Sequence, residues 1–461
     1  MIQKMLIVVL LTAFFMLFIS CSNGKDDSMN FTGAPGEVKL MTLDPGHFHA
    51  ALVQKTMYKQ VDSTVYIYAP EGPDVQDHIN RIEGFNNRAE NPTSWELKVY
   101  IGDDFLQKMI KEKPGNVMVT AGNNQNKTEY IKTTVDAGIN VLADKPMCID
   151  KEGYELLKQA FDSAAENDVL LYDIMTERYE ITTMLQKELA MMPEVFGELA
   201  PGTPEEPAVT KESVHHFFKY VSGNPIKRPA WYFDTTQQGE GIVDVATHLV
   251  DLIQWECFPE QILSPEDVEM VSAKRWVTEV NRAQFEKVTR LPDFPDYLQP
   301  YVKDGVLSVY SNGEFVYKLK GVHAKVSVIW NYQAPEGAGD THFSIMRGTK
   351  ANVIIRQGAE QNYTPKLYVE AVQSDPQFGA ALKAAVDKIA QKYPGVTLEE
   401  QGESWHVAIP DEYRVGHEAH FGQVTEKYLQ FLIDDKLPDW EVPNMITKYY
   451  TTTSALELAL Q

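Results

Sequence analysis

Short apolar runs alternate with helix-like segments between Glu37 and about Asp173. The apolar runs have the length of strands, and the segments between them place apolar residues at helical spacing. This alternation is typical of βαβ units, in which parallel strands form a sheet with helices on both faces. The predicted strands are 38–43, 65–69, 97–101, 116–121, 140–143 and 169–172, and the predicted helices are 49–60, 75–82, 105–111, 128–137 and 153–167. The pattern therefore predicts a doubly wound, nucleotide-binding α/β domain over residues 37–174.

The pattern changes from about Thr176, where strands with period-two alternation begin. The predicted strands are 213–221, 268–277, 306–310, 315–319, 324–332, 341–346 and 352–356. Ser311-Asn312-Gly313 is predicted to be a turn between two of them. Residues 175–461 are therefore expected to form an α+β domain with one large, mostly antiparallel sheet. Within it, 357–412 is predicted to be an added subdomain with a helix at 380–392, and helices at 419–433 and 444–460 close the chain.

The first twenty residues differ from the rest of the chain. Lys4 precedes an uncharged apolar run from Met5 to Ile19, which is too short to span a bilayer as a helix and is typical of a signal peptide. The run ends at Ser20-Cys21 and resembles a bacterial lipoprotein signal, in which the thiol of Cys21 carries lipid. We therefore expect an exported protein that is lipid-anchored to a bacterial membrane, facing the periplasm or the cell surface, with 21–36 as a flexible tether. An ordinary secretory peptide with an incidental cysteine is the alternative.

Composition narrows the possible partners. The 461 residues are 44% hydrophobic and 23% charged, which is typical of a folded protein of two to three domains. The formal net charge of -23 makes nucleic acid an improbable partner, because the phosphate backbone would be repelled. Cys148 and Cys257 lie in apolar surroundings and are expected to be core residues.

Three polar segments follow predicted strands, where the ligand of a doubly wound sheet binds. The segment 44–50 lies where a dinucleotide-binding domain has a glycine-rich turn, but Gly46 is its only glycine, and an ordinary turn explains it equally well. The segment 120–126 is small and polar, and would let a flat ring approach the backbone. The third segment, 144–146, places Lys145 in the shared cleft; an exposed lysine before a turn proline is the alternative.

A glycine-rich loop, Gln237 to Gly241, precedes a predicted helix that contains Asp244 and His248. Residues four apart lie on one helical face, so the acid could orient the imidazole and the imidazole could act as a base. A surface pair of no catalytic importance is the alternative. The apolar residues between the two indicate partial burial, which favours the functional interpretation.

These segments together resemble the glucose-fructose oxidoreductase, inositol dehydrogenase and MocA (Gfo/Idh/MocA) family. Asp144-Lys145-Pro146 is similar to the family's Glu-Lys-Pro, and 239–248 to its glycine loop followed by Asp-x-x-x-His. The segments 175–179 and 195–199 are similar to the family's entry into its second domain. The resemblance extends from about Val38 to Leu252 and is weaker beyond it.

The resemblance implies a Rossmann domain with a tightly bound nicotinamide dinucleotide, and a second domain that holds a sugar, glycoside or polyol. It also implies a homo-oligomer formed through the antiparallel sheet. The implied cofactor-binding residues are Gly46, His47, Phe48, Glu71, Ala121, Gly122, Asn123, Asp144 and Lys145. Glu71, the acid nearest to the ribose position, favours NAD, although NADP is possible.

Oxidation of a secondary alcohol needs a base and a group that stabilises the developing alkoxide. His248 is the expected base, oriented by Asp244, and Lys145 would hydrogen-bond the reacting oxygen; Lys145 as the proton carrier remains open. Arg228, Trp231 and Tyr232 combine a cation with aromatic rings suited to a sugar, with a structural aromatic corner as the equal alternative. Tyr179 is a further substrate-binding candidate.

Several residues depart from the family pattern. Asp44 and His49 replace the first and third glycines of the phosphate turn, and an anionic Asp44 would repel a diphosphate. Asn126 lies roughly where many members have a histidine. The paired histidines 47/49, 215/216 and 417/420 show no convincing metal-ligand spacing, so structural or surface roles and no metal are expected.

Export would deprive the enzyme of free cofactor, so the cofactor is expected to stay bound and to be recycled in the site. Two alternatives stay open. One is a glycoside-cleaving enzyme that works through a transient ketone, because oxidation acidifies the neighbouring C–H. The other is a non-catalytic sugar-binding surface lipoprotein, for which Asp44 is the strongest argument.

Overall fold

The computed structural model describes residues 31–221 and 224–461. The predicted signal segment, the lipidation candidate Cys21 and most of the predicted tether lie outside the described residues. The last part of that tether is not a flexible segment, because Phe31 is 7% exposed and packs in the amino-terminal core. None of the helices in the described part of the chain has the length and apolarity of a membrane span.

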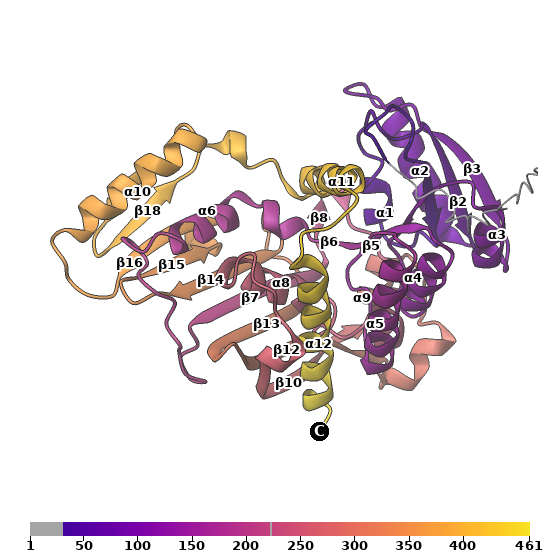
Figure 1. The fold of residues 1–461 in the computed structure, drawn as a ribbon. Coiled ribbons are helices and arrows are strands. Elements are labelled where there is room, and N and C mark those ends of the chain that lie inside the picture. The colour runs from indigo at the N-terminus through magenta and orange to yellow at the C-terminus, as the bar shows by residue number, and fades with distance from the viewer. Residues whose placement is uncertain (1–30, 222–223) are drawn as a thin grey trace, which may run out of the picture. The chain divides into compact units, whose positions relative to one another are not determined.

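The amino-terminal half contains a six-stranded sheet in the order β3-β2-β1-β4-β5-β6, and every pairing is parallel (Figure 1). The strands are β1 (Leu40–Leu43), β2 (Thr64–Ala69), β3 (Glu96–Ile101), β4 (Val117–Thr120), β5 (Asn140–Asp144) and β6 (Leu171–Ile174). The helices are α1 (His49–Leu52), α2 (Pro73–Asn87), α3 (Phe105–Glu112), α4 (Lys127–Asp136) and α5 (Lys151–Glu166). β1, β4 and β5 are buried at every position, as expected of a parallel sheet covered on both faces. The predicted doubly wound α/β domain is therefore confirmed.

α1 is much shorter than the predicted helix over 49–60. Beyond Leu52, side chains bond the backbone carbonyls: the Trp95 indole donates to Gln54 O at 2.6 Å and Arg88 donates to Lys55 O at 2.7 Å. These tertiary contacts replace the helical hydrogen bonds that the periodicity predicted.

The carboxy-terminal half forms a ten-stranded sheet with the order β10-β12-β13-β7-β14-β15-β16-β18-β17, and β11 pairs with β12. The strands are β7 (Val209–Phe218), β10 (Val268–Asn281), β11 (Val302–Lys303), β12 (Val306–Leu319), β13 (Val322–Gln333), β14 (Thr341–Arg347), β15 (Ala351–Arg356), β16 (Lys366–Ala371), β17 (Thr397–Gln401) and β18 (Ser404–Ala408). Only the β13–β7 pairing is parallel among those of this sheet. The predicted large, mostly antiparallel sheet is confirmed. Two short strands, β8 (Tyr220–Val221) and β9 (Asn224–Pro225), pair separately.

The predicted turn at 311–313 is wrong, because β12 runs through it without a break. The pairing with β10 shifts register between Trp276 and Thr278, which marks a β-bulge. The Asn312 amide donates to Trp276 O and Thr278 Oγ1, and its oxygen accepts from the Trp330 N–H at 2.7 Å. The Ser-Asn-Gly sequence is typical of a turn, but here the asparagine is buried and completes a β-bulge within a continuous strand.

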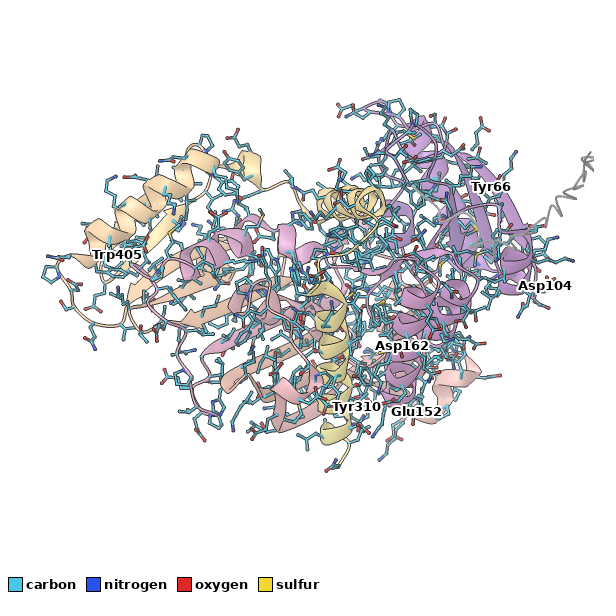
Figure 2. All side chains as sticks on the ribbon, viewed as in Figure 1. Tyr66, Asp104, Glu152, Asp162, Tyr310 and Trp405 are labelled. Atoms are coloured by element: carbon cyan, nitrogen blue, oxygen red, sulfur yellow. The ribbon has the colours of Figure 1, made fainter. Side chains whose placement is uncertain are left out.

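Residues 357–412 do not form a separate subdomain in the described structure. Their strands β16, β18 and β17 extend the large sheet at one edge, and α10 (Phe378–Lys392) packs against it. Trp405 of β18, which is labelled in Figure 2, contacts Phe378 of α10. The two ring centroids are 5.2 Å apart. The added segment therefore lengthens the existing sheet.

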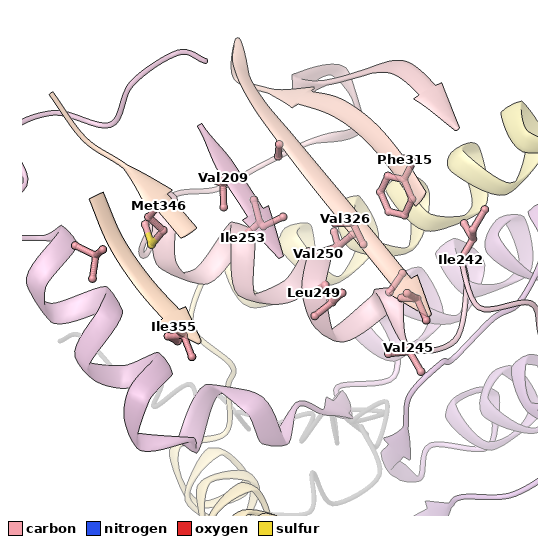
Figure 3. Packing of buried hydrophobic residues seen from close by; sticks show 14 of the residues in the cluster. Val209, Ile242, Val245, Leu249, Val250, Ile253, Phe315, Val326, Met346 and Ile355 are labelled. Atoms are coloured by element: carbon pink, nitrogen blue, oxygen red, sulfur yellow. The ribbon is translucent and has the colours of Figure 1, made fainter. Parts of the chain in front are cut away.

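The remaining helices pack around the two sheets. They are α6 (Ile181–Ala190), α7 (Thr235–Gln238), α8 (Ala246–Cys257), α9 (Arg282–Thr289), α11 (His417–Asp434) and α12 (Glu441–Ala459), with 3₁₀ turns η1 (Thr176–Tyr179), η2 (Ala230–Phe233), η3 (Pro265–Asp267), η4 (Asp296–Tyr301), η5 (Ala359–Gln361) and η6 (Asp411–Tyr413). α8 presents Leu249, Val250 and Ile253 to the apolar face of the large sheet (Figure 3). α11 contributes Phe421 and Tyr428 to the amino-terminal core and contacts α1. The end of the chain thus returns to the first domain.

A buried ion network joins β6, α8 and α12. Arg178 donates to both carboxylate oxygens of Asp251 at 2.7 Å and to Glu441 at 2.8 Å. Lys448 lies 2.8 Å from both Asp251 and Asp173. Burial opposes the charge of Asp251, but its two cationic partners outweigh that effect and hold its pKa well below the usual range. The network fixes the segments that meet behind the candidate site.

Candidate active site

Lys145 follows the carboxyl end of β5 and forms a buried ion pair with the second domain. Its Nζ donates to Asp244 Oδ1 at 2.7 Å, across 99 residues of sequence. Burial opposes the lysine charge, but the carboxylates of Asp244 and Asp144 outweigh it and raise the pKa of Lys145. The side chain is therefore a protonated donor in the site.

The expected pairing of Asp244 with His248 is not formed. α8 begins at Ala246, so Asp244 precedes the helix and the four-residue spacing does not place the two side chains on one helical face. Asp244 Oδ2 instead accepts from Gln238 Nε2 at 3.0 Å, and His248 Nδ1 is buried without a hydrogen-bond partner. Burial and the nearby Lys145 lower the pKa of His248 well below its ordinary value, so the imidazole is neutral. Asp244 therefore positions Lys145 and not His248.

A cavity of about 1110 Å³ surrounds the Lys145–Asp244 pair and is lined from both halves of the chain. His47, His49, Asp144 and Gly122 contribute from the first domain, and His248 contributes from α8. The expected convergence of an ammonium and an imidazole on one space is thus present. Cavities of this size hold small organic ligands.

Polar side chains of the large sheet form another wall of this cavity. Asp340 accepts from His215 Nδ1 at 3.0 Å and from His216 Nδ1 at 3.3 Å, and it also pairs with Lys219. Burial opposes the charge of Asp340, but these partners outweigh it and hold its pKa well below the usual range. His215 also bonds Ser213 Oγ at 2.7 Å. Such fixed donors and acceptors suit a ligand with several hydroxyl groups.

Of the predicted substrate-binding residues Arg228, Trp231 and Tyr232, only two line this cavity. Arg228 donates to Phe217 O at 3.1 Å and lies over the Tyr232 ring, 4.4 Å from its centroid, and both Arg228 and Tyr232 line the cavity. Trp231 does not line it and donates its indole N–H to Asp74 Oδ2 at 2.7 Å. Tyr179 packs against the amino-terminal core and lines neither of the two main cavities.

The turn after β1 does not present its amides to a diphosphate. The Gly46 and His47 N–H groups both donate to Ala121 O, at 3.1 and 3.0 Å. Gly122 makes this approach possible, because an added Cβ would lie 2.4 Å from Asp44 O and 2.7 Å from Gly46 N. α1 has only four residues and offers little helix dipole. The phosphate-binding turn predicted around Gly46 is therefore occupied by internal hydrogen bonds.

Asp44 and Asp74 bring two carboxyl groups to the same turn. Asp44 has a left-handed backbone (φ 46°), and burial raises its pKa to about 6 although Tyr130 Oη bonds it at 3.3 Å. Burial also raises the pKa of Asp74. The repulsion of a diphosphate that the sequence predicted for Asp44 would thus also arise from Asp74.

A second cavity of about 530 Å³ shares this turn with the first. It is lined by Pro45 to Phe48, by the start of α2 and by the second domain, which is where the diphosphate and ribose lie in a dinucleotide-binding fold. Arg81, Lys227 and Arg290 line it beside Asp74. The space and the cations for an adenosine diphosphate group are present, although the turn amides are not free.

Two other predicted cofactor residues, Asn123 and Glu71, line neither of these cavities. Asn123 Nδ2 donates to Gln237 Oε1 at 2.7 Å, and the neighbouring Asn124 donates to Gln238 O at 2.7 Å, so the loop after β4 is tied to the glycine-rich loop. Glu71 is exposed and lines neither of the two main cavities.

Sequence reasoning missed several groups in the large cavity. His417 of α11 lies with its ring centroid 5.2 Å from that of His49, and burial lowers its pKa to about 4. Glu177 follows β6, and burial raises its pKa to about 7, so it titrates near neutrality. No pattern in the sequence around Asp340 indicates a role in a site. Only the polar position of Glu177 after a predicted strand was a usable signal.

The fold and the site together define a two-domain oxidoreductase. The family model described as "Putative oxidoreductase C terminal domain" matches residues 185–460. A crystal structure of a "putative oxidoreductase" from Parabacteroides merdae is 60% identical, covers 94% of this chain and 99% of its own, and has a TM-score of 0.92. The chain therefore belongs to this oxidoreductase family.

More distant structures share the fold. Levoglucosan dehydrogenase in complex with NADH and levoglucosan is 11% identical, covers 92% of this chain and 97% of its own, and has a TM-score of 0.59. The WlbA dehydrogenase from Bordetella pertussis in complex with NADH and UDP-GlcNAcA is 14% identical, covers 94% and 97%, and has a TM-score of 0.52. No curated protein matches the chain.

Proposed function

We propose that the chain is an NAD(P)-dependent oxidoreductase that interconverts a secondary alcohol of a sugar, glycoside or polyol and the corresponding ketone. The observation that carries this proposal is the Lys145–Asp244 ion pair, which lies in a large cavity at the carboxyl end of a doubly wound sheet. Distant neighbours of the same fold bind NADH together with sugars, which supports the same substrate class.

Lys145 acts on the reacting oxygen in this proposal. Its ammonium donates a hydrogen bond to the hydroxyl or carbonyl oxygen and favours the anionic form as the proton leaves. Asp244 holds the ammonium in place. His248, which is neutral and lines the cavity, can accept the hydroxyl proton directly or through a water molecule.

The second-domain wall binds the other hydroxyl groups. His215, Lys219 and Asp340 offer donors and acceptors, and the Tyr232 ring with Arg228 supplies an apolar and cationic surface. A sugar ring needs both kinds of contact.

The cofactor fits the structure in part. A nicotinamide dinucleotide, when bound, accepts the hydride; its diphosphate would meet side chains of the smaller cavity, Arg81 and Lys227, because the turn amides are bonded internally. Lys145, Gly122 and Asn124 line the large cavity and would border the nicotinamide end. Two carboxyl groups at the turn oppose tight binding of a diphosphate.

The test is direct. Native mass spectrometry of the purified chain is expected to show one bound dinucleotide, or titration with NAD or NADP to give saturable binding. Adding a panel of sugars and polyols should then change the absorbance of the nicotinamide. If no dinucleotide binds and sugars still do, the protein is a sugar-binding module and the redox proposal is wrong. Release of an aglycone from a glycoside would favour the glycoside-cleaving alternative.

We also propose that the protein is exported and lipid-anchored through Cys21. The support is the apolar run that ends before this cysteine. Mass spectrometry of the membrane-extracted protein should find an acylated Cys21 at the amino terminus, and Cys21→Ser should release the protein from the membrane fraction. An unmodified cysteine would reject the anchor.

A homo-oligomer formed through the large sheet is a further proposal. β10, at one edge of that sheet, leaves Val271 37% exposed, and most of its other residues are also only partly buried. Light scattering on the purified chain should give a multiple of 52.2 kDa. A monomer at micromolar concentration would reject this interface.

A further inference from the structure

His47, His49 and Asp144 bring three potential ligand atoms together in the wall of the large cavity. These atoms all lie within 4.8 Å of one another. His49 Nδ1 is 3.0 Å from Asp144 Oδ2, and His47 Nδ1 is 3.9 Å from the same oxygen. Ligands about 2.1 Å from one ion lie roughly 3.0 to 3.4 Å apart at octahedral or tetrahedral angles. The cluster is therefore close to the geometry of a coordination site.

We propose that His47, His49 and Asp144 hold a divalent first-row transition-metal ion, such as Zn²⁺, Mn²⁺, Fe²⁺ or Co²⁺. Two imidazoles and one carboxylate suit these ions, whereas Mg²⁺ and Ca²⁺ prefer oxygen ligands. Three protein ligands leave one or more positions free, and all three residues line the large cavity. The ion would thus be open to a ligand oxygen.

A simple His–Asp hydrogen bond accounts for only part of this arrangement. It uses His49 and leaves His47, whose Nδ1 has only a 3.4 Å contact with the His49 N–H, longer than an ordinary hydrogen bond. The two imidazole rings stand edge to face with centroids 4.0 Å apart. A second histidine aimed at the same carboxylate is what a shared ion would explain.

The three ligands are held in place by other parts of the fold. The His47 N–H bonds Ala121 O at 3.0 Å, and the Lys127 ammonium donates to the Asp144 backbone carbonyl at 3.1 Å. The His49 ring packs against Phe421 of α11, with centroids 4.6 Å apart. Preorganised ligands lose less entropy when an ion binds.

The charges near the cluster are mixed, because Lys127, whose pKa burial lowers to about 8, lies near the carboxylates of Asp144 and Asp244. Lys145 is adjacent, but its ammonium is paired with Asp244 at 2.7 Å. Within the described residues, the ion-pair partners of the Asp144 carboxylate are the two histidines of the cluster. His248, with a neutral imidazole, also lines this cavity.

The cluster also gives a reason for the unusual turn after β1. His49 stands where a dinucleotide-binding turn has its third glycine, and a histidine there supplies a ligand. An ion beside Lys145 could polarise the oxygen of a bound hydroxyl or ketone. This inference goes beyond the proposed redox function and does not depend on it.

The experiment measures metal binding without any activity assay. Tag-free protein is stripped with a chelator, incubated in turn with Zn²⁺, Mn²⁺, Fe²⁺ and Co²⁺, desalted, and analysed by elemental mass spectrometry. We expect one ion per chain for at least one metal. Co²⁺ should give visible absorption bands whose intensity reports the imidazole and carboxylate ligands.

Variants then locate the site. His49→Gln and the double change His47→Gln with His49→Gln should lower the affinity at least tenfold and abolish the Co²⁺ bands, whereas His323→Gln, outside the cavity, should leave both unchanged. Circular dichroism checks that each variant is folded, and His47→Gln alone is used if His49→Gln is not. Wild-type protein that retains no stoichiometric ion, or variants that retain the same ion as wild type, would overturn the proposal.

Discussion

The two cavities share the turn after β1 but differ in how their polar groups are used. In the large cavity, the Lys145 ammonium is held by Asp244 at 2.7 Å, and His248 contributes an imidazole from α8. In the smaller cavity, Trp231 bonds Asp74 at 2.7 Å, and the nearby turn amides bond Ala121. The large cavity thus contains a charged pair from both domains, whereas the turn amides beside the smaller cavity are taken up by the fold. Among the other groups of the smaller cavity, His78 has two buried ring nitrogens without hydrogen-bond partners in the described part of the chain, which a ligand could satisfy.

This difference suggests a division of labour. The large cavity is suited to chemistry, because its ammonium, imidazoles and carboxylates converge. The smaller cavity offers space and the cations of Arg81, Lys227 and Arg290. His47, Phe48, Arg228 and Tyr232 line both, so a long ligand could extend from one to the other.

The largest expected effect comes from Lys145 in the large cavity. Lys145→Met removes the ammonium but keeps much of the apolar side chain, and should lower kcat/KM by roughly 10²- to 10⁴-fold with the sugar found in the substrate screen. Dinucleotide binding should change little, because the diphosphate is assigned to the other cavity. Steady-state kinetics and cofactor titration check both statements.

Lys151→Met is the matched control for this change. Lys151 begins α5, is exposed and pairs with Glu457 at 2.9 Å. Neither residue lines either of the two main cavities. Its replacement should leave turnover within about twofold. Equal turnover by wild type and Lys145→Met would remove Lys145 from the reaction.

The sequence predicted the fold better than the site. Buried parallel strands such as β4 and β5 are continuous apolar runs, so their existence and order of appearance could be inferred locally. Lys145 could be placed at a strand end for the same reason. The early end of α1 could not be inferred, because Trp95 and Arg88, which bond the carbonyls just beyond the helix, are distant in sequence.

Site contacts depended on long-range packing. Asp144 lies 95 residues from His49, and His417 reaches His49 only because α11 returns to the first domain. Spacing along the chain therefore showed no metal-like group. Asp244 was predicted to orient His248, but that prediction relied on a helix that starts two residues later, and the carboxylate bonds Lys145.

Arg81 provides the next test, in the smaller cavity. If a diphosphate is held by side chains there, Arg81→Ala should weaken dinucleotide binding by about ten- to a hundredfold, since hydrogen bonds to a charged group contribute roughly 1.5–3 kcal/mol. The kcat at saturating cofactor should change much less. Isothermal titration with NAD and NADP measures the effect.

Arg282→Ala serves as the control, because Arg282 is exposed and lines neither of the two main cavities. An Arg81→Ala protein with wild-type affinity would place the diphosphate elsewhere. The smaller cavity would then no longer be assigned to the cofactor, whereas the assignment of the large cavity to catalysis would stand.

Gly122→Ala tests the packing between the turn and the loop after β4. The new Cβ would meet backbone atoms of Asp44 and Gly46 at 2.4 and 2.7 Å, so the turn must move. We expect a loss of about 1–3 kcal/mol in the free energy of unfolding. Gly84→Ala in α2, where no atom lies within 4 Å of an added Cβ, should be neutral or slightly stabilising in the same denaturant titration.

The smallest expected effect concerns Asp44. Its folded-state pKa of about 6 exceeds the ordinary value of 3.8, so the folded protein binds the proton more tightly and loses stability as the pH rises from about 4 to 6. Asp44→Asn tolerates the left-handed backbone and removes the ionisation. The variant should therefore gain about 1–2 kcal/mol relative to wild type at pH 7 and little at pH 4. Asp304→Asn, at an exposed position with φ 51°, should show no such pH-dependent gain when both are unfolded in urea. A gain for Asp44→Asn that is the same at both pH values would mean that burial does not raise the pKa of the Asp44 carboxyl, and the turn that borders both cavities would then carry an ordinary carboxylate.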